Sequence, residues 1–338
     1  MIEGDLADCP DNRLLTDVTR YRLFVAAVKN YGLLFALALV VAIFSLIHPE
    51  TFPTAANATM IGSTNAVLAM LALAALPPLI VGQFDLSIGF QMGLAQSLLA
   101  GLLVQQRVDI ALALGLTILA GLLIGLLNGL LVAILRLNAF IITLATGILV
   151  EGATQWYTDG QPIFGALPHS LSLIGQTNFG IIPIPVLLVI AAAALMWVVY
   201  EFTTPGRRAV ATGANFRAAR LSGVAVRTVT FASFVWSSIL STTAGVMSTA
   251  IMGSASPGTG GSLLLPAFAG AFLGTTSFRP GRFNAPGTAL AIYVLAAGIS
   301  GLQEGGVHFY IEQLFYGVAL LLSVMISKFA FGSATDAH

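Results

Sequence analysis

The sequence predicts an all-α, polytopic integral membrane protein with about ten transmembrane helices and with both termini in the cytoplasm. Of its 338 residues, 57% are hydrophobic and only 8% are charged, whereas a soluble domain has about 25% charged residues. The apolar residues gather in runs of about 20, the length that a helix needs to cross a bilayer. The basic residues gather on one predicted side of the membrane.

The apolar runs follow one another along the chain with short polar breaks. They lie at about 31–47, 58–82, 87–104, 110–135, 138–157, 181–201, 228–251, 263–278, 285–302 and 308–328. Helices are expected throughout, because backbone polar groups in lipid need internal partners and because the runs lack the alternation of barrel strands. We therefore expect one transmembrane domain at 31–328, a polar cytoplasmic tail at 1–30 and a second tail at 329–338.

Lysine and arginine set the predicted orientation. With the N-terminus inside, all of the 14 basic residues except Arg107 lie at cytoplasmic ends, as the positive-inside rule requires. This split also favours an even number of spans. Five of the arginines lie in one stretch, GRRAVATGANFRAARLSGVAVR at 206–227, and these are Arg207, Arg208, Arg217, Arg220 and Arg227.

Two spans combine internal proline with a glycine-containing segment at the end. The first carries Pro77 and Pro78 and ends in VGQFDLSIG (81–89), and the second carries Pro266 and ends in GTTSFRPGRFNAPG (274–287). Proline kinks a helix, and glycine permits a tight turn. These breaks are candidate hinges or turns, with Gly82, Asp85, Leu86, Ser87, Gly89, Gly274, Gly281 and Gly287 as their residues.

Two further stretches interrupt the apolar pattern. The outer loop at about 158–180 is polar and too short for a domain, and GSASPGTGGS at 253–262 suits a re-entrant turn, which is tolerated only inside protein or beside water. Glycines at positions 121, 125 and 129 form overlapping GxxxG patterns. Such patterns favour close helix packing within the chain over a dimer contact.

Polar residues within the spans are candidates for a substrate path. They are Asn65, Gln91, Glu151 and Gln155. Glu151 is the clearest of them, because an ionisable group in a span is often functional. It could bind substrate, carry protons, or pair with Gln155 or another helix. The amides serve equally well as packing contacts between helices.

Several chemistries are absent from the sequence. It has no GxxxxGK[ST] phosphate loop, no HExxH, no GxSxG and no metal-ligand spacing, so we expect no metal site and no enzyme activity. The single cysteine, Cys9, forms no internal disulfide. Nucleic acid is an unsuitable partner, because the few arginines border membrane spans.

The arginine-rich stretch predicts a small capped helix on the cytoplasmic side. Asn215 is a good N-cap, residues 216–222 make about two turns, and Gly223 suits the position after the helix. A helix this short is unstable alone in water and must dock. It either lies on the lipid headgroups or binds a cytosolic partner. The residues in question are Asn215, Phe216, Arg217, Ala218, Ala219, Arg220, Leu221, Ser222 and Gly223.

Five stretches of the chain form a recognisable set. They are VGQFDLSIG (81–89), GLLNGLLVAILRLNAFIITLATG (125–147), GRRAVATGANFRAARLSGV (206–224), GTTSFRPGRFNAPGT (274–288) and GLQEGGVHFYIEQLFYGVALLL (301–322). In these motifs, and from about residue 55 to 328, the chain resembles the permease subunits of ribose-type sugar ABC importers, which include xylose, galactose and autoinducer-2 permeases. The chain departs from the family pattern at two places, so the resemblance does not identify its substrate. Gln83 stands where many members have glycine, and SLLLPAF (262–268) lacks their acidic residue at about 263 or 264.

The resemblance implies a function and a set of partners. In such permeases the loop at about 202–227 carries a coupling helix that sits in a groove of a separate ATPase subunit, which holds ATP and magnesium. This chain would itself need no cofactor. A second permease copy, identical or related, and a periplasmic or lipid-anchored sugar-binding protein complete the assembly in the bacterial inner membrane. The alternatives from the residues alone are a secondary transporter or channel that uses Glu151, and an intramembrane enzyme.

Overall fold

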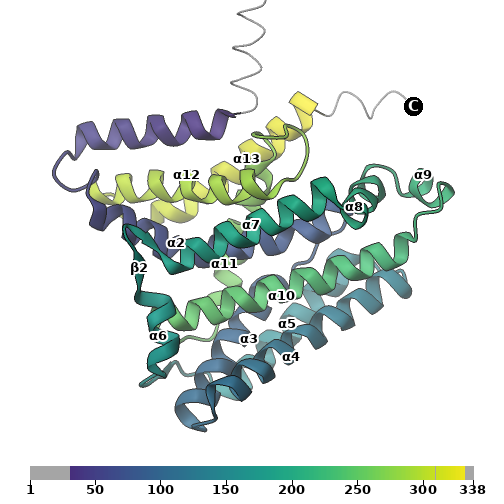
Figure 1. The fold of residues 1–338 in the computed structure, drawn as a ribbon, viewed down its shortest axis with the longest axis horizontal. Coiled ribbons are helices and arrows are strands. Elements are labelled where there is room, and N and C mark those ends of the chain that lie inside the picture. The colour runs from purple at the N-terminus through teal and green to yellow at the C-terminus, as the bar shows by residue number, and fades with distance from the viewer. Residues whose placement is uncertain (1–30, 309, 332–338) are drawn as a thin grey trace, which may run out of the picture.

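A bundle of apolar helices forms the computed structural model, which describes residues 31–308 and 310–331 (Figure 1). Within these residues, seven helices are long and apolar enough to cross a membrane: α2 (Ala55–Ile80), α3 with the π-helical η1 (Ile88–Ala100, Gly101–Gln105), α4 with η2 (Ile110–Gly129, Leu130–Ile134), α5 (Ala139–Thr158), α7 (Ile184–Phe202), α10 (Val226–Met252) and α12 (Ala285–Glu304). Further apolar helices are Tyr31–Ile47, α11 (Thr259–Gly274) and α13 (Tyr310–Phe331). Each predicted run coincides with one of these helices.

Short elements connect the long helices. The predicted loop at 158–180 contains α6 (His169–Gln176) and the strands β1 (Ile163–Phe164) and β2 (Asn178–Phe179); β3 (Ile182–Pro183) and β4 (Ser254–Ala255) follow. β1 pairs antiparallel with β4, with Ile163 opposite Ala255, and β2 pairs with β3, with Phe179 opposite Ile182. The prediction of an all-α chain missed these strands. They are two residues long and pair backbone groups of the connecting loops.

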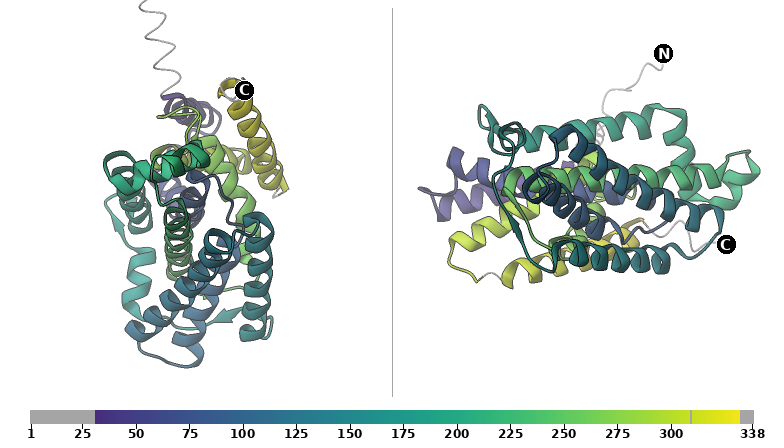
Figure 2. Two further views of the ribbon diagram at one scale, coloured as in Figure 1. Left: turned by 90° about the vertical axis from the view of Figure 1, so that its right-hand side faces the viewer. Right: turned by 90° about the horizontal axis from the view of Figure 1, so that it is seen from below.

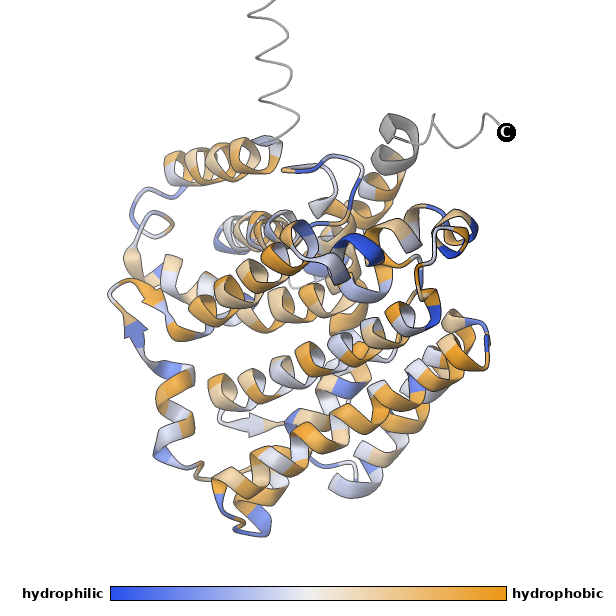
Figure 3. Ribbon diagram, turned by 45° about the vertical axis from the view of Figure 1, so that its right-hand side comes forward, coloured by the Kyte–Doolittle hydropathy of each residue, from blue (hydrophilic) through white to orange (hydrophobic). Residues whose placement is uncertain are grey.

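α10 lies at the centre of the bundle and packs against α2, α3 and α4. α11 packs against α2, α3, α12 and α13. Most helices run along one common direction in the view from below (Figure 2), and hydrophobic residues predominate along them (Figure 3). The chain is a multi-pass membrane protein.

The glycines of the GxxxG patterns, at positions 121, 125 and 129 of α4, explain how closely that helix approaches α10. A Cβ on Gly121 would overlap the Thr242 side chain, and one on Gly125 would overlap Ser238. The GxxxG pattern therefore packs within the chain, as predicted, because only glycine leaves room for the serine and threonine side chains of α10.

Some predicted boundaries differ from the structure. The helix expected at 263–278 is α11 at Thr259–Gly274, because Gly258, with φ +87°, starts the helix inside the glycine-rich stretch. α13 continues to Phe331, into the tail expected at 329–338. The predicted tail at 1–30, with Cys9, and residues 332–338 lie outside the described residues.

Candidate functional site

The connection between α7 and α10 contains two helices, α8 (Thr204–Ala214) and α9 (Phe216–Leu221), which lie at one end of the bundle (Figure 1). We call this the α9 end. The sequence predicted α9 but not α8. Thr203 caps α8 by accepting a hydrogen bond at its Oγ1 from the N–H of Gly206 (3.3 Å), and proline at the second position starts the helix.

Both ends of α9 are capped, as predicted. The Oδ1 of Asn215 accepts a hydrogen bond from the N–H of Ala218 at 2.9 Å. After the helix, Gly223 has φ +80°, which glycine adopts without steric cost. The N–H of Val224 donates to the carbonyl of Ala219 at 3.0 Å, and that of Gly223 donates to the carbonyl of Arg220 at 3.1 Å. This pattern is a Schellman motif, which satisfies the last carbonyls of the helix.

The surface of α9 is open to a partner. Of its six residues only Ala219 is buried, whereas Leu221 is 90% exposed and Phe216 is 51% exposed. Arg217 and Arg220 are also exposed. Exposed apolar side chains beside arginines are typical of interaction surfaces. The helix thus presents the combination expected of a docking element.

α8 connects α9 to the rest of the bundle. A Cβ on Gly213 would overlap the carbonyl oxygen of Ile80, so the end of α8 lies directly against the last turn of α2. At the end of α7, Glu201 forms an ion pair with Arg279 at 2.6 Å. Through these two contacts, the end of α7 and the segment between α7 and α10 touch both glycine-containing breaks. Ile80 directly precedes the break at 81–89, and Arg279 lies in the break at 274–287.

Only two of the predicted turn glycines form turns. Gly82 has φ +77° and Gly281 has φ +80°. Gly89, Gly274 and Gly287 lie in or at the ends of helices, where they permit close contact instead. A Cβ on Gly287 would overlap the carbonyl oxygen of Gly274, and one on Gly89 would overlap that of Gly260. For these three positions the turn prediction was wrong, because crossing helices also require glycine.

The prolines do not break their helices. α2 continues through Pro77 and Pro78 to Ile80, and α11 continues through Pro266. After Gly82 the chain turns back into the bundle, and α3 begins there at Ile88. Both helices do end near the predicted breaks, but each break comes after the prolines and not at them.

Asp85 lies buried in this returning segment, 2% exposed. Its Oδ1 accepts hydrogen bonds from the N–H of Ser87 at 3.0 Å and from the hydroxyl of Ser87 at 2.5 Å. Its Oδ2 lies 3.2 Å from the hydroxyl of Ser237, near the middle of α10. Burying a carboxyl group is costly unless donors surround it, and these contacts fasten the segment to α10.

The hydrogen bonds continue from Asp85 to α4 and α5. Asn128 on α4 donates from Nδ2 to the Ser87 hydroxyl at 2.8 Å and accepts at Oδ1 from the Thr146 hydroxyl at 2.8 Å. The N–H of Leu86 donates to Oγ1 of Thr143 at 2.9 Å. We call Asp85, Ser87, Asn128, Thr143, Thr146 and Ser237 the buried polar cluster. It holds the returning segment between three helices.

Pro78 creates one of the contacts of this cluster. A residue with an N–H at position 78 would donate to the carbonyl of Ala74, four residues earlier, and proline has no N–H. The hydroxyl of Ser237 lies 2.8 Å from this carbonyl and donates to it. Ser237 has one proton, so it serves either the carbonyl or Asp85 at any moment.

The buried polar cluster leads to a first test. Replacing Asn128 with leucine keeps the number and branching of the side-chain heavy atoms but removes the bridge between Ser87 and Thr146, and we expect it to lower the free energy of unfolding by about 1–2 kcal/mol. Thr117 is the matched control on the same helix, because its hydroxyl donates only to Ala113 of α4. Thermal unfolding in detergent measures both. An effect of Asn128→Leu no larger than that of Thr117→Val would contradict an interhelical role.

The predicted path residues do not form one site. Gln91 is buried and donates to the carbonyls of Gly121 (2.8 Å) and Ser238 (3.2 Å), which favours the packing role. Asn65 donates to the carbonyl of Ile61, in its own helix. It lines a cavity of about 270 Å³ among α2, α12 and α13 that also contains Gln303 and Glu312.

Glu151 and Gln155 do lie together. The Nε2 of Gln155 donates to Oε1 of Glu151 at 3.2 Å, one of the pairings predicted. The Oε2 of Glu151 is buried and has no hydrogen-bond partner among the described residues. Glu151 also faces Gly258, which starts α11, and a carboxylate is favourable at a helix N-terminus. Within residues 31–308 and 310–331, no three His, Cys, Asp or Glu residues gather into a metal site.

Sequence reasoning named Ser87 as part of the first break but missed Thr143, Thr146 and Ser237 of the buried polar cluster. For Ser237 there was a signal in the sequence. The available signal was SSILSTTAGVMST at 237–249, which is unusually polar for the middle of a span. Hydroxyl groups can bond to carbonyls within their own helix, so the pattern alone does not identify their partners.

Comparisons with known proteins extend the resemblance over nearly the whole chain. A family model for the permease component of branched-chain amino acid transport systems matches residues 57–326. The ribose import permease protein RbsC of Bacillus subtilis (strain 168) is 32% identical over 306 residues, which are 90% of this chain and 94% of the relative. The D-allose transport system permease protein AlsC of Escherichia coli (strain K12) is 30% identical over 301 residues, 89% of this chain and 90% of the relative.

A more distant relative is the autoinducer 2 import system permease protein LsrD of Photorhabdus laumondii subsp. laumondii, 26% identical over 306 residues, 88% of this chain and 91% of the relative. None of the solved structures matches this chain. The matches to the family model and to the curated permeases confirm the resemblance drawn from the sequence motifs. This chain belongs to the family of permease components of branched-chain amino acid transport systems.

Proposed function

We propose that this chain is the permease subunit of an ATP-binding cassette importer and carries a sugar, a monosaccharide in particular, across the bacterial inner membrane. Two relatives that match about nine-tenths of the chain are named for ribose and D-allose. These names favour a sugar over the amino acids in the family description. The second permease copy and the sugar-binding protein at the outer face are part of this proposal.

The observation that carries the proposal is α9. It is a capped helix with exposed Phe216 and Leu221 at the end of the bundle where the arginines gather. The positive-inside rule assigns that end to the cytoplasm, where an ATPase would bind. The chain therefore acts as the membrane partner of a separate enzyme, which supplies ATP, magnesium and hydrolysis.

The contacts of α8 and of the end of α7 suggest how ATPase binding would move the bundle. A shift of α9 acts on α2 through Gly213 and Ile80, and on the 275–284 turn through Glu201 and Arg279. The turns at Gly82 and Gly281 are the hinges of this scheme. The driving energy is the difference in affinity of the ATPase for the two states of the permease.

Glu151 supports a second candidate, a self-sufficient secondary transporter. A half-buried carboxyl group whose Oε2 lacks a partner among the described residues could carry a proton within the membrane. In that case α9 would need no ATPase, and a proton gradient would drive uptake.

Reconstitution separates the two candidates. We expect proteoliposomes that contain the chain with its cognate ATPase and sugar-binding protein to take up radiolabelled sugar only when ATP and magnesium are supplied to the ATPase. The chain alone should show no uptake under an imposed proton gradient. Gradient-driven uptake by the chain alone, abolished by Glu151→Gln, would replace the importer with the secondary transporter.

A further inference from the structure

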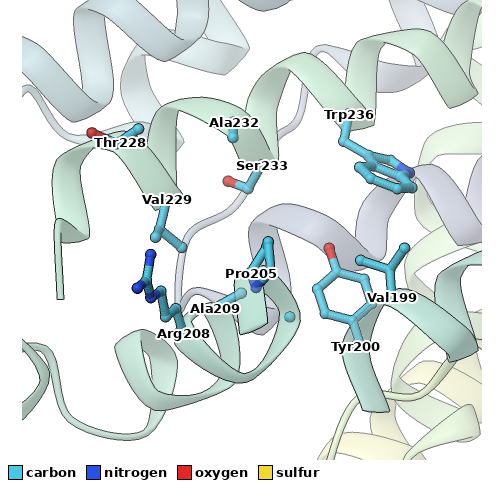
Figure 4. Close-up of a pocket in the computed structure, with 11 residues that line it drawn as sticks. Val199, Tyr200, Pro205, Arg208, Ala209, Thr228, Val229, Ala232, Ser233 and Trp236 are labelled. Atoms are coloured by element: carbon cyan, nitrogen blue, oxygen red, sulfur yellow. The ribbon is translucent and has the colours of Figure 1, made fainter. Parts of the chain in front are cut away.

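A cavity of about 260 Å³ opens between the α7–α8 corner and the first half of α10, beside the connection that carries α9 (Figure 4). Its floor and walls are mainly apolar and include Val199, Pro205, Ala209, Val229 and Ala232. We call it the α7–α10 pocket. Its walls offer few hydrogen-bonding groups, so the pocket suits part of an acyl chain better than a sugar.

Five polar side chains border the α7–α10 pocket. Thr228 and Ser233 lie on α10 itself, and the other three are Arg208, Tyr200 and Trp236. Figure 4 shows Arg208 on α8 and Tyr200 on α7 reaching toward α10, with Trp236 beyond Tyr200. In the described part of the chain, none of these three side chains has a hydrogen-bond or ion-pair partner. Arg279, by comparison with Arg208, forms an ion pair with Glu201. Arg208 thus offers an unpaired cation at one side of an apolar cavity.

The surface around the pocket is apolar. On α7, Leu195 is 57% exposed, Val198 is 43% exposed and Phe202 is 63% exposed. On α10, Ile239 is 47% exposed. In a membrane such side chains face acyl chains. The pocket therefore opens onto lipid, and Arg208 lies at the end of the bundle where headgroups begin.

From these observations we propose that the α7–α10 pocket binds an anionic phospholipid. One acyl chain lies along Val199, Val229 and Ala232, and the phosphate accepts hydrogen bonds from the guanidinium of Arg208, which binds phosphate through several donors. Tyr200, near the end of α7, has the amphipathic ring that is favoured near the headgroup boundary. The assignment to the cytoplasmic leaflet rests on the proposed orientation, but the binding itself does not require transport.

The three tryptophans of the chain, Trp156, Trp197 and Trp236, allow a direct test. In the full-length variant Trp156→Phe/Trp197→Phe, only Trp236 fluoresces, and it borders the pocket. The purified, delipidated protein is titrated in detergent with phosphatidylglycerol brominated on its acyl chains, and in parallel with brominated phosphatidylcholine. We expect phosphatidylglycerol to quench Trp236 at a lower concentration than phosphatidylcholine.

Three arginine variants and one alanine variant make the result specific. Arg208→Gln should weaken phosphatidylglycerol binding about fivefold, the loss expected for one basic residue at an anionic lipid surface, and Arg208→Lys should restore part of it. Arg217→Gln on α9 removes the same charge outside the pocket and should leave the affinity unchanged. Ala232→Phe should reduce quenching by filling the pocket.

Three results would overturn the proposal. Equal quenching by the two lipids would show that the pocket does not select an anion, and an equal loss in Arg208→Gln and Arg217→Gln would show that the arginines act only by general attraction. Displacement of the lipid by millimolar inorganic phosphate, with the same dependence on Arg208, would identify a site for free phosphate instead. Transport activity enters none of these measurements, so their failure leaves the importer proposal untouched.

Discussion

Reversing both charges on α9, in the variant Arg217→Glu/Arg220→Glu, should reduce ATP-driven sugar uptake to about a tenth or less of its normal rate. Both side chains are exposed, so the change should leave the fold and membrane insertion intact. It places two negative charges on a helix proposed to enter a groove of the ATPase, where like-charge or unpaired contacts cost several kcal/mol. The measurements are uptake in proteoliposomes and co-purification of the ATPase with the permease.

The matched control is Arg136→Glu, compared with the single variants Arg217→Glu and Arg220→Glu. It makes the same change in charge at the same end of the bundle, but in the loop after α4, and its side chain is exposed. We expect this control to retain its uptake and its ATPase, whereas each α9 variant loses part of both. If Arg136→Glu loses as much uptake as the α9 variants, or if the α9 double variant transports normally, α9 is not the coupling helix.

Placing a methyl group on Gly260 should have the largest effect on stability. A Cβ there would overlap the carbonyl oxygen of Gly89, and it would also lie 2.9 Å from the backbone nitrogen of Gly93. Backbone atoms cannot swing away as a side chain can, so α11 and α3 must separate. We expect Gly260→Ala to lower the free energy of unfolding by about 3 kcal/mol, at the upper end of the cost of overpacking.

Gly152→Ala and Gly115→Ala are the controls for this substitution. A Cβ at either position would meet nothing within 4 Å, and alanine favours a helix over glycine by about 1 kcal/mol. Their melting temperatures in detergent should therefore equal or exceed that of the unmodified protein, while Gly260→Ala melts well below it. A normal melting temperature for Gly260→Ala would show that α3 and α11 do not cross as closely as described.

The helices were predictable from the sequence because lipid imposes one simple rule. A backbone in hydrocarbon must satisfy its own hydrogen bonds, so apolar length alone locates the spans. The caps of α9 were equally predictable, since Asn215 and Gly223 act through local geometry. α8 was not, because TPGRRAVATGA contains a proline and two glycines, and the helix is held by its contact with α2 through Gly213.

The roles of individual polar residues were harder to predict. Gln91 was as plausible a path residue as Asn65, yet it joins three helices and is buried. Asp85 was predicted as part of a hinge, and the structure places it in the buried polar cluster instead. The difference depends on which helices meet in space, and contacts between residues about 150 positions apart leave no local pattern.

Pro78 and Ser237 show how such a distant contact constrains sequence change. The hydroxyl of Ser237 supplies the hydrogen bond that Pro78 withholds from Ala74. A residue with an N–H at position 78 would take over that bond and leave the Ser237 proton to Asp85 alone. The cost of losing the hydroxyl at position 237 therefore depends on the residue at position 78. Mutations at these two positions are epistatic, although 158 residues of chain lie between them.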